Sequence, residues 1–290
     1  MFQIVRVPSG AADLPEQMGT KAKFWFDENR RLFKEGRPGT GENWAEVIAA
    51  ELAALLGLPH AKYSLAEYEE RRGVVSESFV PAGARLILGN ELIGFAAREI
   101  PSRRIRREAH TIGRLGRLLN RPSVALPSGW VSPKPTFNAA DVMSGYLLLD
   151  ALIANQDRHE ENWGFINSRG AIYLAPTFDH ASSLGRNETD QRRMQKLTAN
   201  HPDHGVYGYA RRAKVPIYYG SGQLHSSEAF FALSRVCPDK GRHWLNRLRE
   251  IDPNSFAALL GRIPVGWITD PARRFADELL RVNRNRLLDQ

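Results

Sequence analysis

The sequence predicts an α+β fold in two lobes, a strand-rich first third followed by a mostly helical remainder. In the first third, short runs in which apolar and polar residues alternate are bounded by turn residues, which is typical of strands. Beyond it, apolar residues recur at three- and four-residue intervals, which is typical of amphipathic helices. The chain has 290 residues and no fixed-period repeat, so we expect one unit with lobes at 1–85 and 86–290.

The first lobe is predicted to contain one helix among strands. The strands are expected in five runs: 3–7, 21–27, 30–34, 62–68 and 74–80. The helix is expected at 42–56, where apolar residues follow a 3.6-residue period until Gly57 and Pro59 end it. Residues 81–83, Pro-Ala-Gly, then predict a hinge between the lobes.

The second lobe is predicted to be helical apart from one hairpin. Helices are expected at seven places: 105–120, 138–154, 188–199, 226–236, 241–250, 253–261 and 271–288. Short strands are expected only at 163–167 and 171–174, and the intervening Ser-Arg-Gly favours a β-hairpin.

The composition excludes several classes of protein. With 42% hydrophobic and 25% charged residues, the chain resembles ordinary globular proteins rather than disordered ones. No apolar run approaches the roughly 18 residues of a membrane span, and the N-terminal segment lacks the layout of a secretory signal. The single cysteine, Cys237, cannot form an internal disulfide, so we expect a cytoplasmic protein.

The positive charge is concentrated in the second part of the chain. The net charge is +8, with 11 Lys and Arg against 12 Asp and Glu in residues 1–90 and 29 against 20 in residues 91–290. Two stretches, 98–121 and 186–214, carry the excess. Clustered cations of this kind indicate either a polyanionic partner such as nucleic acid or a solvated helix face.

A cluster of polar residues follows the predicted helix at 138–154. It consists of Asn155, Asp157, His159 and Asn162, and the hairpin would fold Asp179 back beside Asn162. Amide and carboxylate oxygens are ligands suited to Mg²⁺, and Asp157 would lie close enough to orient or deprotonate a hydroxyl. Each residue taken alone could equally be a turn or cap residue, but together they match the base-and-metal arrangement of kinase-like phosphoryl transfer.

Two motifs resemble the catalytic and metal-binding loops of the HipA-like kinase family. They are N-x-D-x-H-x-x-N at 155–162 and L-A-P-x-x-D-x-x-S-S at 174–183. The first lobe is similar as well, with a short Gly-containing loop at 18–25, a strand lysine at Lys34 and a helix glutamate at Glu46 ahead of Leu-Gly-Leu. The resemblance extends from about residue 18 to 214 and implies a bilobal protein-kinase-like fold.

The resemblance also implies an ATP- and Mg²⁺-dependent serine/threonine protein kinase. Asp157 would be the catalytic aspartate that engages the acceptor hydroxyl, and Asn162 and Asp179 would hold Mg²⁺. Lys34 would contact the α- and β-phosphates of ATP, steadied by Glu46. The other nucleotide contacts would come from the phosphate loop and from the segment before the hinge: Gly19, Thr20, Glu77 and Phe79.

The family resemblance gives expectations about partners. A toxin-type role with an antitoxin-type partner would be in keeping with it. The basic stretch at 186–214 follows the Asp179 loop, where kinase-like folds dock substrates, so we expect a protein substrate with an acidic or RNA-associated surface. Direct nucleic-acid binding is a less favoured use of this charge, and the stretch at 98–121 is expected to be a solvated face.

Three alternative functions remain open at the level of sequence. The run D-R-H-x-x-N at 157–162 also resembles the catalytic loop of phosphatidylinositol 3-/4-kinases, which act on lipids. A metal-dependent phosphohydrolase could use Asp and His residues, namely Asp157, His159, Asp179, His180, His201 and His204. A pseudokinase or basic nucleic-acid-binding module is the non-catalytic alternative, although Lys34, Glu46, Asp157, Asn162 and Asp179 are all present.

Overall fold

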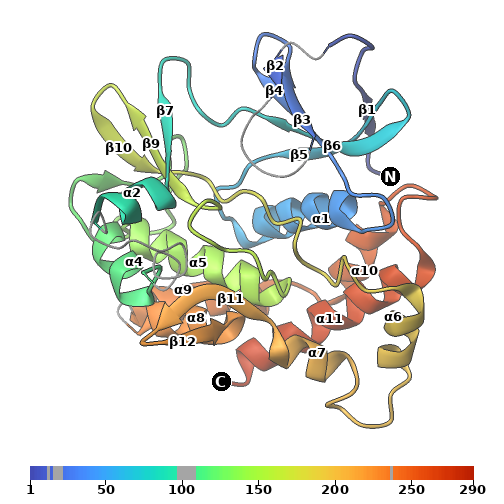
Figure 1. Cartoon of the computed structure of the whole chain (residues 1–290). Helices are drawn as coiled ribbons and strands as arrows, with labels where there is room; N and C mark the ends of the chain where they lie inside the picture. Colours follow the sequence, from blue (N-terminus) through green and yellow to red (C-terminus); the bar gives the residue numbers. More distant parts are fainter. Residues whose placement is uncertain (12–13, 16–21, 97–108, 236–237) are drawn as a thin grey trace.

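The computed structural model describes residues 1–290 except 12–13, 16–21, 97–108 and 236–237. Strands of the first part of the chain lie above the helix α1 (Glu42–Leu56), and most of the other helices lie below it (Figure 1). The chain is therefore a mixed α+β structure whose first part is rich in strands, as the sequence predicts. Among the described residues, no helix combines the length and the apolar composition needed to cross a membrane.

The first sheet contains the strands of the predicted first lobe. Its order is β1-β5-β6-β4-β3-β2, and its strands are β1 (Ile4–Arg6), β2 (Leu14–Pro15), β3 (Lys23–Phe26), β4 (Arg31–Glu35), β5 (Tyr63–Tyr68) and β6 (Arg71–Glu77). Neighbouring strands are antiparallel except β1 and β5, which are parallel. Lys34 on β4 lies opposite Val74 of β6, so the candidate phosphate-binding lysine is on a strand with neighbours on both sides.

Helix α1 has the bounds that the sequence predicts. The apolar residues of its inner face, among them Ile48 and Leu52, are fully buried, whereas Leu55 is 38% exposed, and the helix contacts β5 and β6. Gly57 ends it in the left-handed conformation, with φ of 76°, which costs glycine little because it has no Cβ. The core-facing side of α1 also buries two acidic residues, Glu42 and Glu46, and these need polar partners.

The second sheet contains the predicted hairpin. Its order is β7-β9-β10-β8, and its strands are β7 (Arg85–Leu88), β8 (Val124–Ala125), β9 (Gly164–Ser168) and β10 (Ala171–Leu174). In the hairpin, Phe165 pairs with Leu174, and the N–H of Ala175 donates to the carbonyl of Gly164. The pairing therefore brings the segment after β10 back to the start of β9, next to Asn162.

The helices of the second part pack around α5 (Ala139–Leu152), every residue of which is buried. A capping box between Asn138 and Asp141 fixes its first turn. The other helices described here are α2 (Gly89–Ala96), α4 (Ile112–Leu119), α6 (Asp190–Leu197), α7 (Val206–Arg212), α8 (Ser226–Ser234), α9 (Pro238–Glu250), α10 (Asn254–Gly261) and α11 (Asp270–Leu288). Among these, α4, α8, α9 and α11 contact α5 directly, so this helix is the centre of the core.

The prediction that the second part has only two strands is wrong. The structure adds β7, β8 and the hairpin of β11 (Lys214–Tyr219) and β12 (Gly222–His225), as well as the unpredicted helices α2 and α7. These elements are short, and β7 is stabilised by pairing with β9, which is distant in sequence. The helix predicted at 105–120 starts at Ile112 in the described part, after the N-cap Thr111, and residues 105–108 lie outside the described residues.

His110, next to α4, is a buried histidine whose surroundings require the neutral form. Its Nδ1 donates to the carbonyl of Pro216 at 2.8 Å, and its Nε2 accepts from the indole N–H of Trp163 at 3.0 Å. Burial lowers the pKa of His110 to about 4. The same contact anchors Trp163, the residue after Asn162.

We therefore expect a pH-dependent loss of stability from His110. Between pH 6.5 and 4 the unfolded chain binds a proton that the folded chain does not, so the free energy of unfolding falls by up to about 3 kcal/mol as the pH falls. Urea denaturation at several pH values should show a shallower decline for His110→Gln than for the wild type. A His110 resonance that titrates near 6.5 in the folded protein would contradict this expectation.

Candidate active site

Lys34 and Asp179 meet in the structure although they are far apart in sequence. Lys34 Nζ lies 3.1 Å from Asp179 Oδ1, and the two side chains are 14% and 32% exposed. Burial by itself would lower the pKa of Lys34, but the charge of Asp179, followed by Tyr63 and Glu46, outweighs it and raises the pKa. Lys34 is therefore a fixed cation at neutral pH.

Asp179 is held in an uncommon backbone conformation. Its φ is +59°, in the left-handed region that side chains other than glycine rarely adopt. Its N–H donates to the hydroxyl of Tyr63 at 3.3 Å. Two residues earlier, the N–H of Thr177 donates to the carbonyl of Pro59, and the carbonyl of Thr177 accepts from Ala61. A left-handed backbone conformation at a residue other than glycine is strained, so it persists only where surrounding contacts impose it. Strain of this kind is frequent at functional sites.

The loop after α5 places Asp157 at the surface and Asn162 beneath it. The Asp157 carboxylate is 46% exposed. Its Oδ2 accepts from Ser182 Oγ at 3.0 Å, and His159 Nε2 lies 3.6 Å from its Oδ1. The side-chain amide of Asn162 donates to the Asp157 carbonyl at 2.7 Å, so Oδ1 is the Asn162 atom that could bind a cation.

A buried ion pair supports this loop from below. Arg158 donates through Nε and Nη2 to the two carboxylate oxygens of Asp150 on α5, at 2.7 and 2.8 Å, and both side chains are 1% exposed. Arg158 Nη1 also donates to the carbonyl of Asn162 at 2.6 Å, and Asn155 Nδ2 donates to Asp150 at 2.8 Å. The pair therefore fixes both ends of the Asp157 loop.

The sequence reasoning overlooked Arg158 and Asp150. One signal was available, because Asp150 is an acidic residue within the apolar run Leu147–Ile153. A carboxylate in a buried helix requires a partner, and the neighbouring loop offers one basic residue, Arg158.

Glu46 contacts the segment after Asp179. Its Oε1 accepts from the backbone N–H of His180 at 2.7 Å. Among the described residues, the ion pair of Lys34 is with Asp179, and Glu46 affects the Lys34 pKa through its charge. Glu46 thus lies beside the segment of Asp179, and its hydrogen bond is with the backbone of His180 rather than with Lys34.

The residues expected to hold the nucleotide are only partly described. Gly19 and Thr20 lie outside the described residues. Phe79, two residues after β6, stacks on Phe178 with ring centroids 5.3 Å apart, which places the pre-hinge segment beside the residue that precedes Asp179. Glu77 is exposed at the end of β6, where it pairs in register with Arg31.

The polar groups of the site suit a hard divalent cation. Asp179, which pairs with Lys34, offers a carboxylate, and Asn162 offers the oxygen of its side-chain amide. In the described part of the chain, no group of three or more His, Cys, Asp and Glu residues could hold a metal ion. His180 is buried with its Nε2 2.7 Å from Thr177 Oγ1, so it does not form the histidine-rich centre of a phosphohydrolase.

Several cations of the basic stretch 186–214 are used within the protein. Arg193 is buried, donating to Asp190 at 2.7 Å and to the carbonyl of Gly185, and Lys196 pairs with Glu188 at 2.8 Å. Arg186 pairs with the buried Glu42 of α1. These three cations brace the segment after Asp179, which leaves less of its charge for recruiting a substrate than the sequence suggests.

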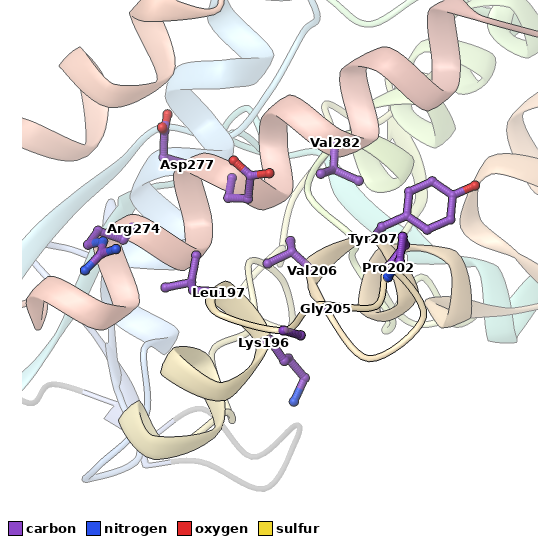
Figure 2. A pocket seen from close by; sticks show the side chains of 11 residues that line it. Lys196, Leu197, Pro202, Gly205, Val206, Tyr207, Arg274, Asp277 and Val282 are labelled. Carbon is purple, nitrogen blue, oxygen red and sulfur yellow. The ribbon is translucent and has the colours of Figure 1, made fainter.

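A groove of about 540 Å³ lies between this segment and α11. Figure 2 shows its two walls, with Arg274 and Val282 on α11 and Lys196, Val206 and Tyr207 on the opposite side. None of the described candidate site residues lines it. The groove is therefore separate from the pair of Lys34 and Asp179.

Comparisons with known proteins agree with this architecture. No protein-family model and no curated protein sequence matches the chain. Among solved structures, the Helicobacter pylori proinflammatory kinase CtkA has a TM-score of 0.72 and 17% identity, over 97% of this chain and 96% of CtkA. HipA of Shewanella oneidensis MR-1, solved with HipB and operator DNA, has a TM-score of 0.61 and 14% identity, over 95% of this chain and 67% of that one.

These similarities confirm the predicted fold class. The matches extend over nearly the whole chain, and both structures are similar in fold at low sequence identity. The chain thus has the kinase-like α+β fold that CtkA and HipA share, and this is the HipA-like fold that its motifs predict.

Proposed function

We propose that the chain is an ATP- and Mg²⁺-dependent kinase that transfers the γ-phosphate to a serine or threonine hydroxyl of a protein. The observation that carries this proposal is that the segment of Asp179 contacts both Lys34, through Asp179 itself, and Asp157, through Ser182, within a kinase-like fold. Phosphoryl transfer needs positioned cations and a residue that orients the acceptor more than it needs covalent chemistry, and these residues are of the types required.

Each residue has a role in this proposal. Asp157 accepts a hydrogen bond from the acceptor hydroxyl and receives its proton as the bond from oxygen to the γ-phosphorus forms and the bond to the departing ADP oxygen breaks. Ser182, bound to Asp157 Oδ2, holds that carboxylate in one orientation. Lys34, which is cationic at neutral pH, exchanges part of its contact with Asp179 for phosphate oxygens.

Mg²⁺ would be held by Asp179 and the Oδ1 of Asn162, with waters and phosphate oxygens completing its coordination. When bound, it would neutralise negative charge on the phosphates. The types of ligand support this assignment, since carboxylate and amide oxygens are those that Mg²⁺ prefers. Glu46 keeps the backbone next to Asp179 in place through its bond to His180.

A protein acceptor is proposed over a lipid, on the resemblance of the 174–183 motif and on the fold shared with CtkA and HipA. HipA was solved in a complex with HipB. An antitoxin-type partner for this chain belongs to the proposal on that basis, as does a protein substrate with an acidic or RNA-associated surface.

The proposal is tested by γ-phosphate labelling of a bacterial lysate with the purified protein and Mg-ATP. We expect labelled protein with the wild type and about 10²-fold less with Lys34→Met, because the substitution removes the fixed cation. Lys62→Met, which changes an exposed lysine beside β5, is the matched control and should label like the wild type.

The labelled fraction decides among the alternatives. Label in a lipid fraction alone would favour the lipid kinase. A wild type that binds no Mg-ATP and transfers no phosphate to itself, to protein or to lipid would refute the kinase proposal. Equal labelling by Lys34→Met and wild type would remove Lys34 from the site.

A further inference from the structure

A chain of buried polar contacts connects α1 to the catalytic loop through the residues around Asp179. Glu46 Oε1 accepts from the backbone N–H of His180 at 2.7 Å and lies 3.5 Å from the ring Nδ1 of the same residue. His180 Nε2 is 2.7 Å from Thr177 Oγ1, and Arg158 Nη2 donates to that oxygen at 3.0 Å. Arg158 then joins Asp150 on α5.

The donors and acceptors of this chain are compatible with one arrangement. Arg158 can only donate, so its bond to Thr177 uses a lone pair of the hydroxyl and leaves the hydroxyl proton for His180 Nε2. Nε2 then acts as the acceptor, and the ring proton is on Nδ1, which faces the Glu46 carboxylate. The Nδ1 contact at 3.5 Å is not a hydrogen bond, so the bond that joins His180 to Glu46 is the one from its backbone N–H, and each hydrogen bond between Asp150 and Glu46 then has a direction.

Burial makes the arrangement costly to break. The side chains of Glu46, His180, Thr177, Arg158 and Asp150 are all at most 2% exposed. A buried donor or acceptor that loses its partner costs about 1–3 kcal/mol, and more when it is charged. Water cannot readily replace a missing partner at such depth. If α1 shifts relative to the catalytic loop, the hydrogen bonds that connect them must therefore either break or move with it.

The contacts lie on both sides of Asp179. Thr177 precedes it by two residues and His180 follows it directly, while Asp179 itself has the left-handed φ of +59°. We infer that His180 and Thr177 are positioning residues that couple Glu46 of α1 to Arg158 of the catalytic loop and thereby hold Asp179 in its working position. The catalytic consequence of this inference rests on the proposed kinase function, whereas the linkage itself does not.

The test uses a pair of substitutions of similar shape at Thr177. Thr177→Val keeps the volume and removes the hydroxyl, and Thr177→Ser keeps the hydroxyl. We expect Thr177→Val to lower kcat about 10-fold and to raise the Mg²⁺ concentration needed for half-maximal rate, with KM for the protein acceptor unchanged. Thr177→Ser should restore both values to within about twofold of the wild type.

A merely structural role would give a different result. If Thr177→Val lost thermal stability but kept the wild-type kcat and Mg²⁺ requirement, or if Thr177→Ser were as impaired as Thr177→Val, the inference would be overturned. Should Thr177→Val fail to fold, the pair His180→Leu and His180→Gln gives the same comparison, because the glutamine amide can still accept from Thr177.

A second measurement needs no activity. Nitrogen NMR of histidine-labelled protein, with His180 identified from the spectrum of His180→Gln, should show an unprotonated Nε2 in the wild type and a changed ring state in Thr177→Val. A protonated Nε2 in the wild type would overturn the linkage whatever the activity. If the wild type shows this ring state but transfers no phosphate, the proposed kinase function is refuted, while the linkage through Thr177 and His180 stands.

Discussion

Asp157→Asn is expected to lower γ-phosphate transfer by about 10²-fold or more, while ATP binding stays within a few-fold of the wild type. The substitution is nearly isosteric, and the asparagine Oδ1 can still accept the bond from Ser182 that now reaches Asp157 Oδ2. In the proposed function, the substitution removes the negative charge that would orient the acceptor hydroxyl and take up its proton. The loss should therefore appear in kcat rather than in folding or nucleotide affinity.

Single-turnover phosphoryl transfer and equilibrium titration with ATP measure these two effects separately. Asp289→Asn, an exposed residue after α11, is the matched control and should behave like the wild type. Transfer by Asp157→Asn at more than about a tenth of the wild-type rate would assign the catalytic role to another group. A parallel loss of thermal stability would instead indicate that Asp157 acts through the structure of its loop.

Much of the fold follows from local sequence patterns. Helix α1 has the predicted bounds because its apolar period, its buried face and its terminal Gly57 all agree. The hairpin of β9 and β10 was predictable because two short apolar runs are separated by a turn. Strand β7 and the β11–β12 hairpin were not, since β7 is stabilised by its pairing with β9 and β11 has an irregular register.

The residues of the candidate site likewise divide into those that the sequence indicates and those that only the structure reveals. The motifs indicated Asp157, Asn162 and Asp179 from their spacing, and the hairpin explains why the segment of Asp179 returns to the start of β9 next to Asn162. The contacts of Tyr63 with Asp179 and of Thr177 with Arg158 depend on side chains brought together by tertiary packing. No local pattern specifies such contacts, so the supporting residues of the site could be found only in the structure.

The buried pair of Arg158 and Asp150 supports the loop that carries Asp157, and its loss gives the largest expected effect on stability. Burial disfavours the charge of Arg158, but Asp150 outweighs this and raises the Arg158 pKa. Asp150→Ala would leave a guanidinium, 1% exposed, without its carboxylate. We expect this to reduce the free energy of unfolding by about 3–5 kcal/mol, with loss of the loop geometry around Asp157.

Urea denaturation of matched variants compares the free energy of unfolding lost with the buried carboxylate to that lost with one partner of a surface ion pair. Glu250→Ala, which removes the partner of Arg247 at the surface, should change stability by less than about 1 kcal/mol. Asp150→Ala combined with Arg158→Met should be less destabilised than Asp150→Ala alone, because the double variant buries no unpaired charge. If Asp150→Ala lost no more stability than Glu250→Ala, the pair would not be what holds the loop, and Arg158 would have to be stabilised by its bonds to Asn162 and Thr177 instead.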